Sequence, residues 1–495
     1  MASTGEAGAG AGPAQGRREW WWLAAILGVA LVIRLVVLVR FPNIYYTDEV
    51  HHYLEQAHRI VFGYGWVPFD VSSGIRSMTV PGLLAVPLWL ASLVSDEPEV
   101  LTTVVGAAVV LLSLLSVVGA WIAGRRLSQV HAIVAASVVA VWYELVHHAA
   151  RTLTEAMATA PLILALALAG TPAPRRRTLA LTGVLLGACI VLRFQLAPAA
   201  LLIGGWVAWR NGRRSVVPLL VGALVPLAIL GAVDWWVQGI PFGSIVNNVR
   251  INVVEHFADN FGVTPPWEYL VMWRDQWLAV GPVLVVLVLL GARRLPLWLL
   301  TAAVIIASHS LIGHKEYRFI LPAMGVLVVL AAIGSAEILV WMRRELQGER
   351  RGGVALAGLL LMWAATSWML ALGPSEQFRW SDRRAVMAAS HHLHDQPDVC
   401  GIGLRGIQWW DTGAYSHIHL RVPIFQLEAG TPDAHPEAYD IQLFRPSSQP
   451  DLPEGYAQEA CFATSTDQVC VLRRPGGCRH VDGLDPAQPT DGVPM

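Results

Sequence analysis

Eleven apolar runs constrain the fold of this chain more than any other feature of its sequence. The first extends from Trp20 to Val39, and the others lie near residues 100–123, 129–146, 156–170, 179–192, 197–209, 215–233, 277–292, 295–311, 320–341 and 354–372. A helix needs roughly 20 apolar residues to cross a bilayer. Only 14% of the 495 residues are charged, against about 25% in soluble domains, which excludes a soluble globular enzyme. The runs predict an all-α polytopic membrane protein of eleven transmembrane helices.

Arginine clusters between the runs predict the orientation of the chain. With a cytoplasmic N-terminus, the clusters at 125–126, 175–177, 210–214, 293–294 and 343–351 all lie on the cytoplasmic side, as the positive-inside rule requires. The run from Thr79 to Val94 is short and contains Pro81 and Pro87, so we expect an interfacial or re-entrant helix there. Most His, Asp and Glu residues then lie outside, and we expect an extracytoplasmic active face.

Three segments differ in composition. Residues 1–16 are rich in Ala and Gly and predict a disordered cytoplasmic tail. Residues 17–372 predict the transmembrane domain, with its first outer loop at 41–99, and residues 373–495 predict a small extracytoplasmic α/β domain. We expect strands at 398–404 and 469–473 and a short helix ending near 391–395. This last segment holds four cysteines, which permit three disulfide connectivities. Residues 459–464 and 469–473 resemble a hairpin, so Cys461–Cys470 is the first pairing we expect.

The overall charge balance limits the partners of the chain. Its 35 basic and 36 acidic residues give a net charge of −1, which provides no bulk attraction for nucleic acid. Lys315 is the only lysine, and such arginine usage is typical of a GC-rich coding sequence. We therefore expect a bacterial source and no nucleic-acid partner.

The first outer loop opens with Thr47, Asp48 and Glu49. Thr47 can cap a helix on which Asp48, His52 and Glu55 share one face, and such a carboxylate at the membrane surface can act as a general base. The alternative is a capped amphipathic helix whose acidic residues favour its N-terminus. The His and Glu residues show no diagnostic metal-ligand spacing, so we expect no cofactor and leave a divalent metal open.

The segment Gly313–Phe319 places His314, Lys315 and Arg318 on the outer side, against the positive-inside rule. These three side chains can hold a phosphate whose charge grows as it leaves. The alternative is an interfacial anchor whose basic side chains snorkel, but the only lysine of the chain favours a functional role. We therefore expect Lys315 to contribute most, with Arg193 and Arg76 as further phosphate ligands.

Ionisable residues in or beside the apolar runs are costly and usually functional. Arg34, Glu144 and Asp234 are such residues. Arg34 and Glu144 lie near the ends of their runs, so we expect both to snorkel to the interface.

Several of these motifs carry a resemblance to a known family. Gly313–Phe319 resembles the His-Lys-Glu-x-Arg-Phe motif of the Alg9/PIG-B type mannosyltransferases, glycosyltransferase family 22 of the GT-C membrane enzymes. The first loop is similar in the order of its motifs, which are Asp48-Glu49, Glu55, His58, Phe62-Gly63-Tyr64-Gly65 and Gly74-Ile75-Arg76-Ser77 with Pro81. Where the family usually has Trp-Glu, this chain has Phe69-Asp70, so the acceptor contact there stays open.

The resemblance covers about residues 20–345, with a weaker similarity at Tyr415–His419. It implies that Asp48 is the catalytic base and that Glu49 positions the base or the acceptor. It implies donor phosphate contacts from His314, Lys315, Arg318, Arg193 and Arg76, and acceptor or supporting roles for Glu55, His58, Asp70 and Glu316.

The activity implied is inverting transfer of a hexose, with mannose expected, from a polyprenyl-phosphate sugar to an extracytoplasmic glycan or glycolipid acceptor at a bacterial cell membrane. One alternative is a GT-C transferase for another lipid-linked sugar. The other is a non-catalytic lipid or glycan transporter, which predicts ionisable residues midway along the spans and duplicated halves. Neither feature is evident in the sequence.

Overall fold

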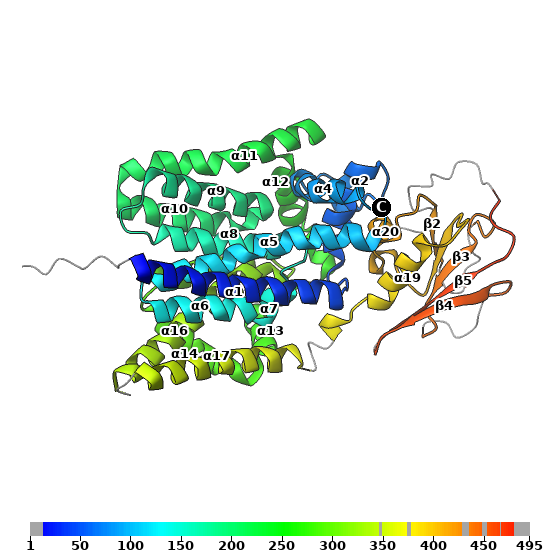
Figure 1. The fold of residues 1–495 in the computed structure, drawn as a ribbon. Helices are drawn as coiled ribbons and strands as arrows, with labels where there is room; N and C mark the ends of the chain where they lie inside the picture. The colour runs from blue at the N-terminus through cyan, green and yellow to red at the C-terminus, as the bar shows by residue number, and fades with distance from the viewer. Residues whose placement is uncertain are drawn as a thin grey trace, which may run out of the picture.

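The computed structural model describes residues 13–345, 349–373, 378–427, 435–447, 453–465 and 467–479. The described chain forms a bundle of long helices, a group of short helices at one end of the bundle, and a small sheet beyond them (Figure 1). Of the predicted tail at residues 1–16, residues 1–12 lie outside the described residues. The remainder forms the first turn of helix α1 (Pro13–Arg40).

A helix forms at each of the eleven predicted apolar runs. With α1, these helices are α5 (Pro98–Arg125), α6 (Gln129–Val141), α8 (Thr154–Ala169), α9 (Arg176–Leu192), α10 (Ala197–Asn211), α11 (Val216–Gln238), α14 (Gly281–Ala292), α15 (Pro296–Ser310), α16 (Leu321–Glu345) and α17 (Glu349–Ala371). Within the described chain, six helical segments are long and apolar enough to cross a bilayer, and the others are shorter. The protein is an integral membrane protein, and the number of crossings stays a prediction.

Helix α16 lies at the centre of the bundle, where small residues let backbones approach closely. A Cβ added at Gly291 of α14 would lie 2.0 Å from the Leu330 carbonyl oxygen of α16. A Cβ at Gly334 of α16 would lie 1.9 Å from the Leu287 oxygen of α14. Such small-residue contacts are the usual means of close helix packing in membranes, so these glycines fix the approach of α14 to α16.

The short helices lie between the bundle and the sheet (Figure 1). They include the π-helix η1 (Glu49–Leu54), α2 (Glu55–Phe62), α4 (Thr79–Ser92) and α12 (Gly243–Asn248). Helix α4 contains Pro87, packs against α2 and leaves Leu83, Val86 and Trp89 exposed. A short helix with an uncovered apolar side at this end of the bundle agrees with the interfacial placement predicted for it.

The loops that carry the arginine clusters lie at the opposite end of the bundle. The connections from α8 to α9 and from α10 to α11, the end of α16 and the start of α17 all lie away from the sheet (Figure 1). Arg126 donates to the Thr171 hydroxyl at 2.7 Å, which joins two of these loops. The clusters therefore gather on one side, as the charge pattern predicted.

The C-terminal region forms a five-stranded sheet in the order β2-β1-β3-β5-β4. Its strands are β1 (Ile402–Arg405), β2 (Ile424–Leu427), β3 (Ile441–Phe444), β4 (Ala457–Ala463) and β5 (Gln468–Arg473). Strand β1 pairs in parallel with β2 and β3, whereas β5 is antiparallel to β3 and β4. Helices α19 (Arg384–His394) and α20 (Ala414–Ile418) pack on the sheet through a core that includes Val386, Leu393, Ile402 and Val471. The predicted α/β character and the β4–β5 hairpin are confirmed.

Two disulfides cross-link the C-terminal region. Cys461 and Cys470 lie opposite each other on β4 and β5 and are bonded, as the hairpin predicted. Cys400 is bonded to Cys478, which connects the start of the sheet to the segment after its last strand. Disulfides persist in oxidising compartments, which suits a region on the outer side of the membrane.

Candidate active site

Asp48 lies at the start of η1, at the end of the bundle that faces the sheet region. Its Oδ2 atom is 2.8 Å from Nη1 of Arg318, 3.5 Å from Nδ1 of His52 and 3.8 Å from Nη2 of Arg76. Burial raises the pKa of Asp48, but Arg318, His52 and Arg76 together hold it well below its usual range. Asp48 is therefore a carboxylate at neutral pH.

Arg318 lies between two carboxylates. Besides Asp48, its guanidinium contacts Oε1 of Glu316 at 2.7 Å and lies 5.0 Å from the ring centroid of Tyr46. Its Nε atom is buried and has no hydrogen-bond partner among the described residues. Arg318 thus has one N–H donor without a partner among the described residues, beside two carboxylates that a phosphate can replace. These features suit a phosphate-binding group.

The position of Arg318 is fixed by the preceding residue. The Tyr317 hydroxyl donates to Glu144, and the Glu144 carboxylate also accepts from the indole nitrogens of Trp142 at 2.8 Å and Trp277 at 3.2 Å. Glu144 is fully buried, so the expectation that it snorkels is wrong. Arg34 is buried as well. It donates to the carbonyl oxygens of Val139 and Ala140 at the end of α6.

A second guanidinium lies near the first. Arg193, at the end of α9, forms an ion pair of 3.0 Å with Glu155 at the start of α8. Its guanidinium carbon is 4.7 Å from the ring centroid of Phe319, and that of Arg318 is 5.3 Å from the same ring. Arg193 and Arg318 therefore lie beside the same aromatic ring.

Arg76 and Asp70 complete the cluster from the first outer loop. Nε of Arg76 is 3.0 Å from Oδ2 of Asp70, which is 3.6 Å from Nε2 of His52. The hydroxyl of Ser77 donates at 2.6 Å to Asp234, a fully buried carboxylate at the end of α11. The segment around Arg76 is thereby tied to the bundle. The shorter carboxylate of Asp70 reaches the cluster, and Arg76 lies between carboxylates.

His314 and Lys315 are placed differently from each other. Nε2 of His314 is 3.2 Å from Glu316, whose hydrogen bond raises the pKa of His314 although burial opposes the shift. The Lys315 ammonium donates to the carbonyl oxygens of Thr264 at 2.9 Å, Ile312 at 2.5 Å and Gly313 at 3.3 Å. Because backbone oxygens occupy this ammonium, the structure favours a loop-positioning role for Lys315 over the phosphate contact expected from the sequence.

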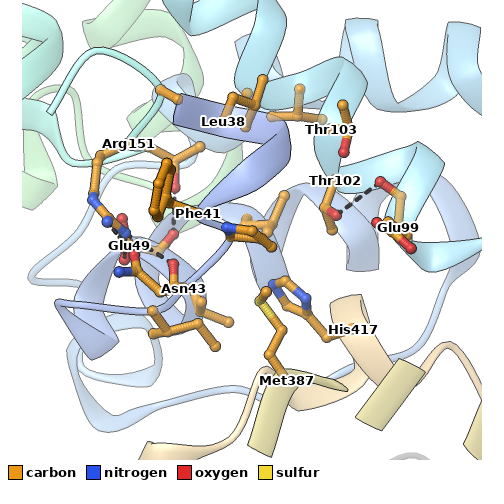
Figure 2. Close-up of a pocket in the computed structure, with 18 of the residues that line it drawn as sticks. Leu38, Phe41, Asn43, Glu49, Glu99, Thr102, Thr103, Arg151, Met387 and His417 are labelled. Carbon is orange, nitrogen blue, oxygen red and sulfur yellow. Dashed lines mark hydrogen bonds and ion pairs between the residues drawn. The ribbon is translucent and has the colours of Figure 1, made fainter. Parts of the chain in front are cut away.

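Glu49 faces away from this cluster although it follows Asp48 directly. Its Oε1 atom is 2.8 Å from Nη1 of Arg151 and accepts from the Tyr45 amide at 3.0 Å. Burial raises the pKa of Glu49, with Arg151 opposing the shift. Glu49 and Arg151 line a pocket that also includes Met387 and His417 of the C-terminal region (Figure 2).

Glu55 and His58 lie at the junction with the C-terminal region. Glu55 accepts from the backbone N–H groups of Trp66 at 2.7 Å and Ser416 at 2.8 Å, and burial raises its pKa to about 7. The expectation that Glu55 shares a face with Asp48 is wrong because residues 49–54 form a π-helix, whose wider turn rotates the following residues. Nε2 of His58 is 2.9 Å from Nδ1 of His419.

The structure also adds residues that the sequence-based site lacked. Glu155 joins the cluster through Arg193, and Arg151 holds Glu49. The signal for Glu155 was a carboxylate at the start of an apolar run, where ionisable groups are usually functional. No pattern in the sequence paired Arg151 with Glu49.

Comparisons with known proteins identify the family of the chain. The model of the Alg9-like mannosyltransferase family matches residues 25–419. GPI mannosyltransferase 3 of Yarrowia lipolytica is 23% identical over 426 residues, covering 82% of this chain and 77% of that protein. GPI alpha-1,2-mannosyltransferase 3 of Danio rerio is 25% identical over 362 residues, covering 68% of this chain and 63%, less than two thirds, of that protein.

A solved structure shares the fold. The crystal structure of ArnT from Cupriavidus metallidurans bound to undecaprenyl phosphate superposes with a TM-score of 0.55 at 13% identity, covering 93% of this chain and 99% of that chain. At this identity the likeness shows the fold, which is the GT-C fold. Because the family model matches well over half of the sequence, the chain belongs to the Alg9-like mannosyltransferase family of membrane enzymes.

Proposed function

We propose that the protein is an inverting mannosyltransferase that moves mannose from a polyprenyl-phosphate sugar to a hydroxyl of an extracytoplasmic glycan or glycolipid. The observation that carries this proposal is the ion pair between Asp48 and Arg318 at the membrane-facing end of the outer loops. A base and a phosphate-binding cation must both lie there, because the leaving phosphate remains attached to a lipid. Relatives named as GPI mannosyltransferases support the sugar and the glycolipid acceptor.

In the proposed reaction, Arg318 and Arg193 bind the donor phosphate. The acceptor oxygen attacks the anomeric carbon from the side opposite the phosphate, and the bond from that carbon to the phosphate oxygen breaks with its electron pair. The polyprenyl phosphate therefore leaves with one more negative charge. Guanidiniums that already lie in place stabilise this charge as it develops.

Asp48 takes the proton of the acceptor hydroxyl as the new bond forms. Without donor, Arg318 lies 2.8 Å from Asp48 and keeps the pKa of that carboxyl low, which makes it a weak base. A phosphate that engages Arg318 competes with this contact. The pKa of Asp48 then rises toward its usual value, so donor binding activates the base.

The other predicted residues take supporting roles in this proposal. Glu49 positions the acceptor from the pocket in Figure 2, and Asp70 and Glu316 hold the cations of the cluster. Glu55 and His58 hold the C-terminal region over the first outer loop. We assign residues 17–372 to the catalytic membrane domain and residues 373–495 to the C-terminal domain.

The active face is proposed to be extracytoplasmic, in a bacterial cell membrane. The arginine clusters lie at the end of the bundle away from Asp48, and the positive-inside rule places that end in the cytoplasm. The two disulfides suit an oxidising outer compartment. The single lysine among 35 basic residues supports the bacterial source.

In vitro transfer with the purified protein and defined polyprenyl-phosphate sugars tests the proposal. We expect labelled glycolipid product from the mannose donor and none from matched glucose or arabinose donors. The Asp48→Asn variant, reconstituted in the same detergent, is the matched control for background transfer. Transfer from another sugar but not from mannose would refute the donor assignment, and no transfer from any donor in a folded preparation would refute the reaction.

A further inference from the structure

Metal-binding side chains from two distant parts of the chain meet beside the junction with the C-terminal region. Asp96 and Glu97 lie in the loop between α4 and α5, and His394 is the last residue of α19. One ligand atom of each of these residues lies within 4.8 Å of those of the other two. The ring of His419, which follows α20, has its centroid 5.5 Å from that of His394. Two carboxylates and one imidazole thus gather where the outer loop meets the sheet region, and the His419 ring lies beside that imidazole.

The hydrogen bonds around His419 fix which of its nitrogens carries the proton. Nδ1 of His58 lies 3.1 Å from the Tyr64 carbonyl oxygen, which can only accept, so His58 carries its proton there. Nε2 of His58 is then the acceptor of the 2.9 Å contact with Nδ1 of His419. His419 therefore donates through Nδ1 and has a lone pair on Nε2. This contact holds His419 against the first outer loop, beside His394.

His394 and the carboxylates also have unused binding capacity. Nδ1 of His394 is buried and makes no hydrogen bond with the described part of the chain. The side chains of Asp96 and Glu97 are exposed and form no ion pair with any described residue.

We propose that Asp96, Glu97 and His394 bind a divalent metal ion of the Zn²⁺ type that fastens the C-terminal region to the first outer loop. Zn²⁺ accepts imidazole nitrogen and carboxylate oxygen in four-coordinate sites, whereas Ca²⁺ and Mg²⁺ prefer oxygen ligands alone. Three protein ligands leave a fourth position for a water molecule. The ion joins the start of α5 to the end of α19, beside the contact between His58 and His419.

A simpler explanation exists for the carboxylates. Glu97 precedes the N-terminus of α5, where negative charge favours the helix dipole. That explanation predicts no metal and gives no reason for the unpartnered nitrogen of His394. Metal analysis separates the two explanations without a transfer assay.

The full chain, purified in detergent, is stripped with a chelator and titrated with Zn²⁺ alone, with bound metal measured by mass spectrometry and stability by thermal unfolding. We expect one tightly bound Zn²⁺ per chain and a higher Tm in its presence. The double variant Asp96→Asn/Glu97→Gln changes exposed side chains only. This double variant and the separate His394→Ala variant should each bind Zn²⁺ at least tenfold more weakly than the parent chain. His392→Ala is the matched control, because His392 lies on the same helix but contacts Gln396 and Glu459.

The His392→Ala variant should bind Zn²⁺ like the parent chain. The proposal is overturned if the parent chain binds no Zn²⁺ after equilibration. It is also overturned if the folded double variant and the His394→Ala variant bind Zn²⁺ as tightly as the parent.

Discussion

The Asp48→Asn variant tests the two effects assigned to Asp48, which are accepting the acceptor proton and holding Arg318. Asparagine keeps the size of the side chain but loses the basic oxygen and the charge. Loss of a positioned general base lowers turnover by about 10²- to 10⁴-fold. The same change frees Arg318 from its contact of 2.8 Å, so the variant should bind the donor more tightly while it transfers sugar more slowly.

The size of the binding effect follows from the charges in the cluster. The cluster contains four carboxylates that form ion pairs with three guanidiniums. The carboxylates are those of Asp48, Asp70, Glu155 and Glu316, and the guanidiniums are those of Arg76, Arg193 and Arg318. The donor phosphodiester adds a further negative charge and must displace one carboxylate from Arg318. A hydrogen bond to a charged group contributes about 1.5 to 3 kcal/mol. In Asp48→Asn this carboxylate contact of Arg318 is already lost before the donor binds. If the contact contributes an energy at the lower end of that range, its loss makes donor binding about tenfold tighter.

Donor dissociation constants from equilibrium binding and single-turnover rates with labelled donor measure the two effects separately. Asp70→Asn is the comparison variant, since Asp70 contacts His52 and Arg76 but not Arg318, and we expect it to lower turnover less than Asp48→Asn does. The reasoning fails if Asp48→Asn transfers at the parental rate or binds donor more weakly. It also fails if Asp70→Asn, and not Asp48→Asn, loses turnover.

Four further predictions follow from the same contacts. Donor binding is proposed to raise the low pKa of Asp48. The acidic limb of the kcat profile, which reports the enzyme–substrate complex, should therefore lie at higher pH than that of kcat/KM, which reports the free enzyme. Acidic limbs that coincide in the two pH–rate profiles would contradict base activation. Glu55→Gln leaves one of two backbone N–H groups without an acceptor, so limited proteolysis should release the C-terminal region faster, and an unchanged rate would contradict the junction. Lys315→Arg should lower Tm and raise KM for the donor with little loss of kcat, because a planar guanidinium cannot donate to all three carbonyl oxygens that surround the ammonium. A fall in kcat alone would instead indicate direct contact between Lys315 and the phosphate. A cysteine placed at Arg176 should react with impermeant reagents only from the cytoplasmic side, and labelling from outside would overturn the orientation.

Most of the fold could be predicted from periodicity and composition. The apolar runs predicted the helices of the bundle, and the proline-containing run forms the helix Thr79–Ser92, whose interfacial placement stays a prediction. The disulfide between Cys461 and Cys470 followed from a hairpin pattern. The π-helix at Glu49–Leu54 could not be predicted, because its local propensities are those of an α-helix and tertiary contacts select the wider turn.

The site was harder to predict because polar roles depend on distant partners. Lys315 attracted attention correctly as the only lysine, but the three carbonyl oxygens that surround its ammonium come together only in the fold. Arg318 was recognised from its motif, whereas its pairing with Asp48 joins residues 270 positions apart. Residue type therefore indicated which segments carry the chemistry, and only the tertiary arrangement indicated which atoms face each other.

The cations of the cluster are positioned through their neighbours in sequence and not through their own charges. Tyr317 donates to buried Glu144 and places Arg318, and Ser77 donates to buried Asp234 and places Arg76. Each guanidinium is thus held in position by an adjacent side chain, while its own donors contact carboxylates at the surface of the cluster. Arg318 can therefore exchange Asp48 for a phosphate without movement of the segment that carries it. Fixed cations with exchangeable partners are what a reaction needs when negative charge grows on the leaving group.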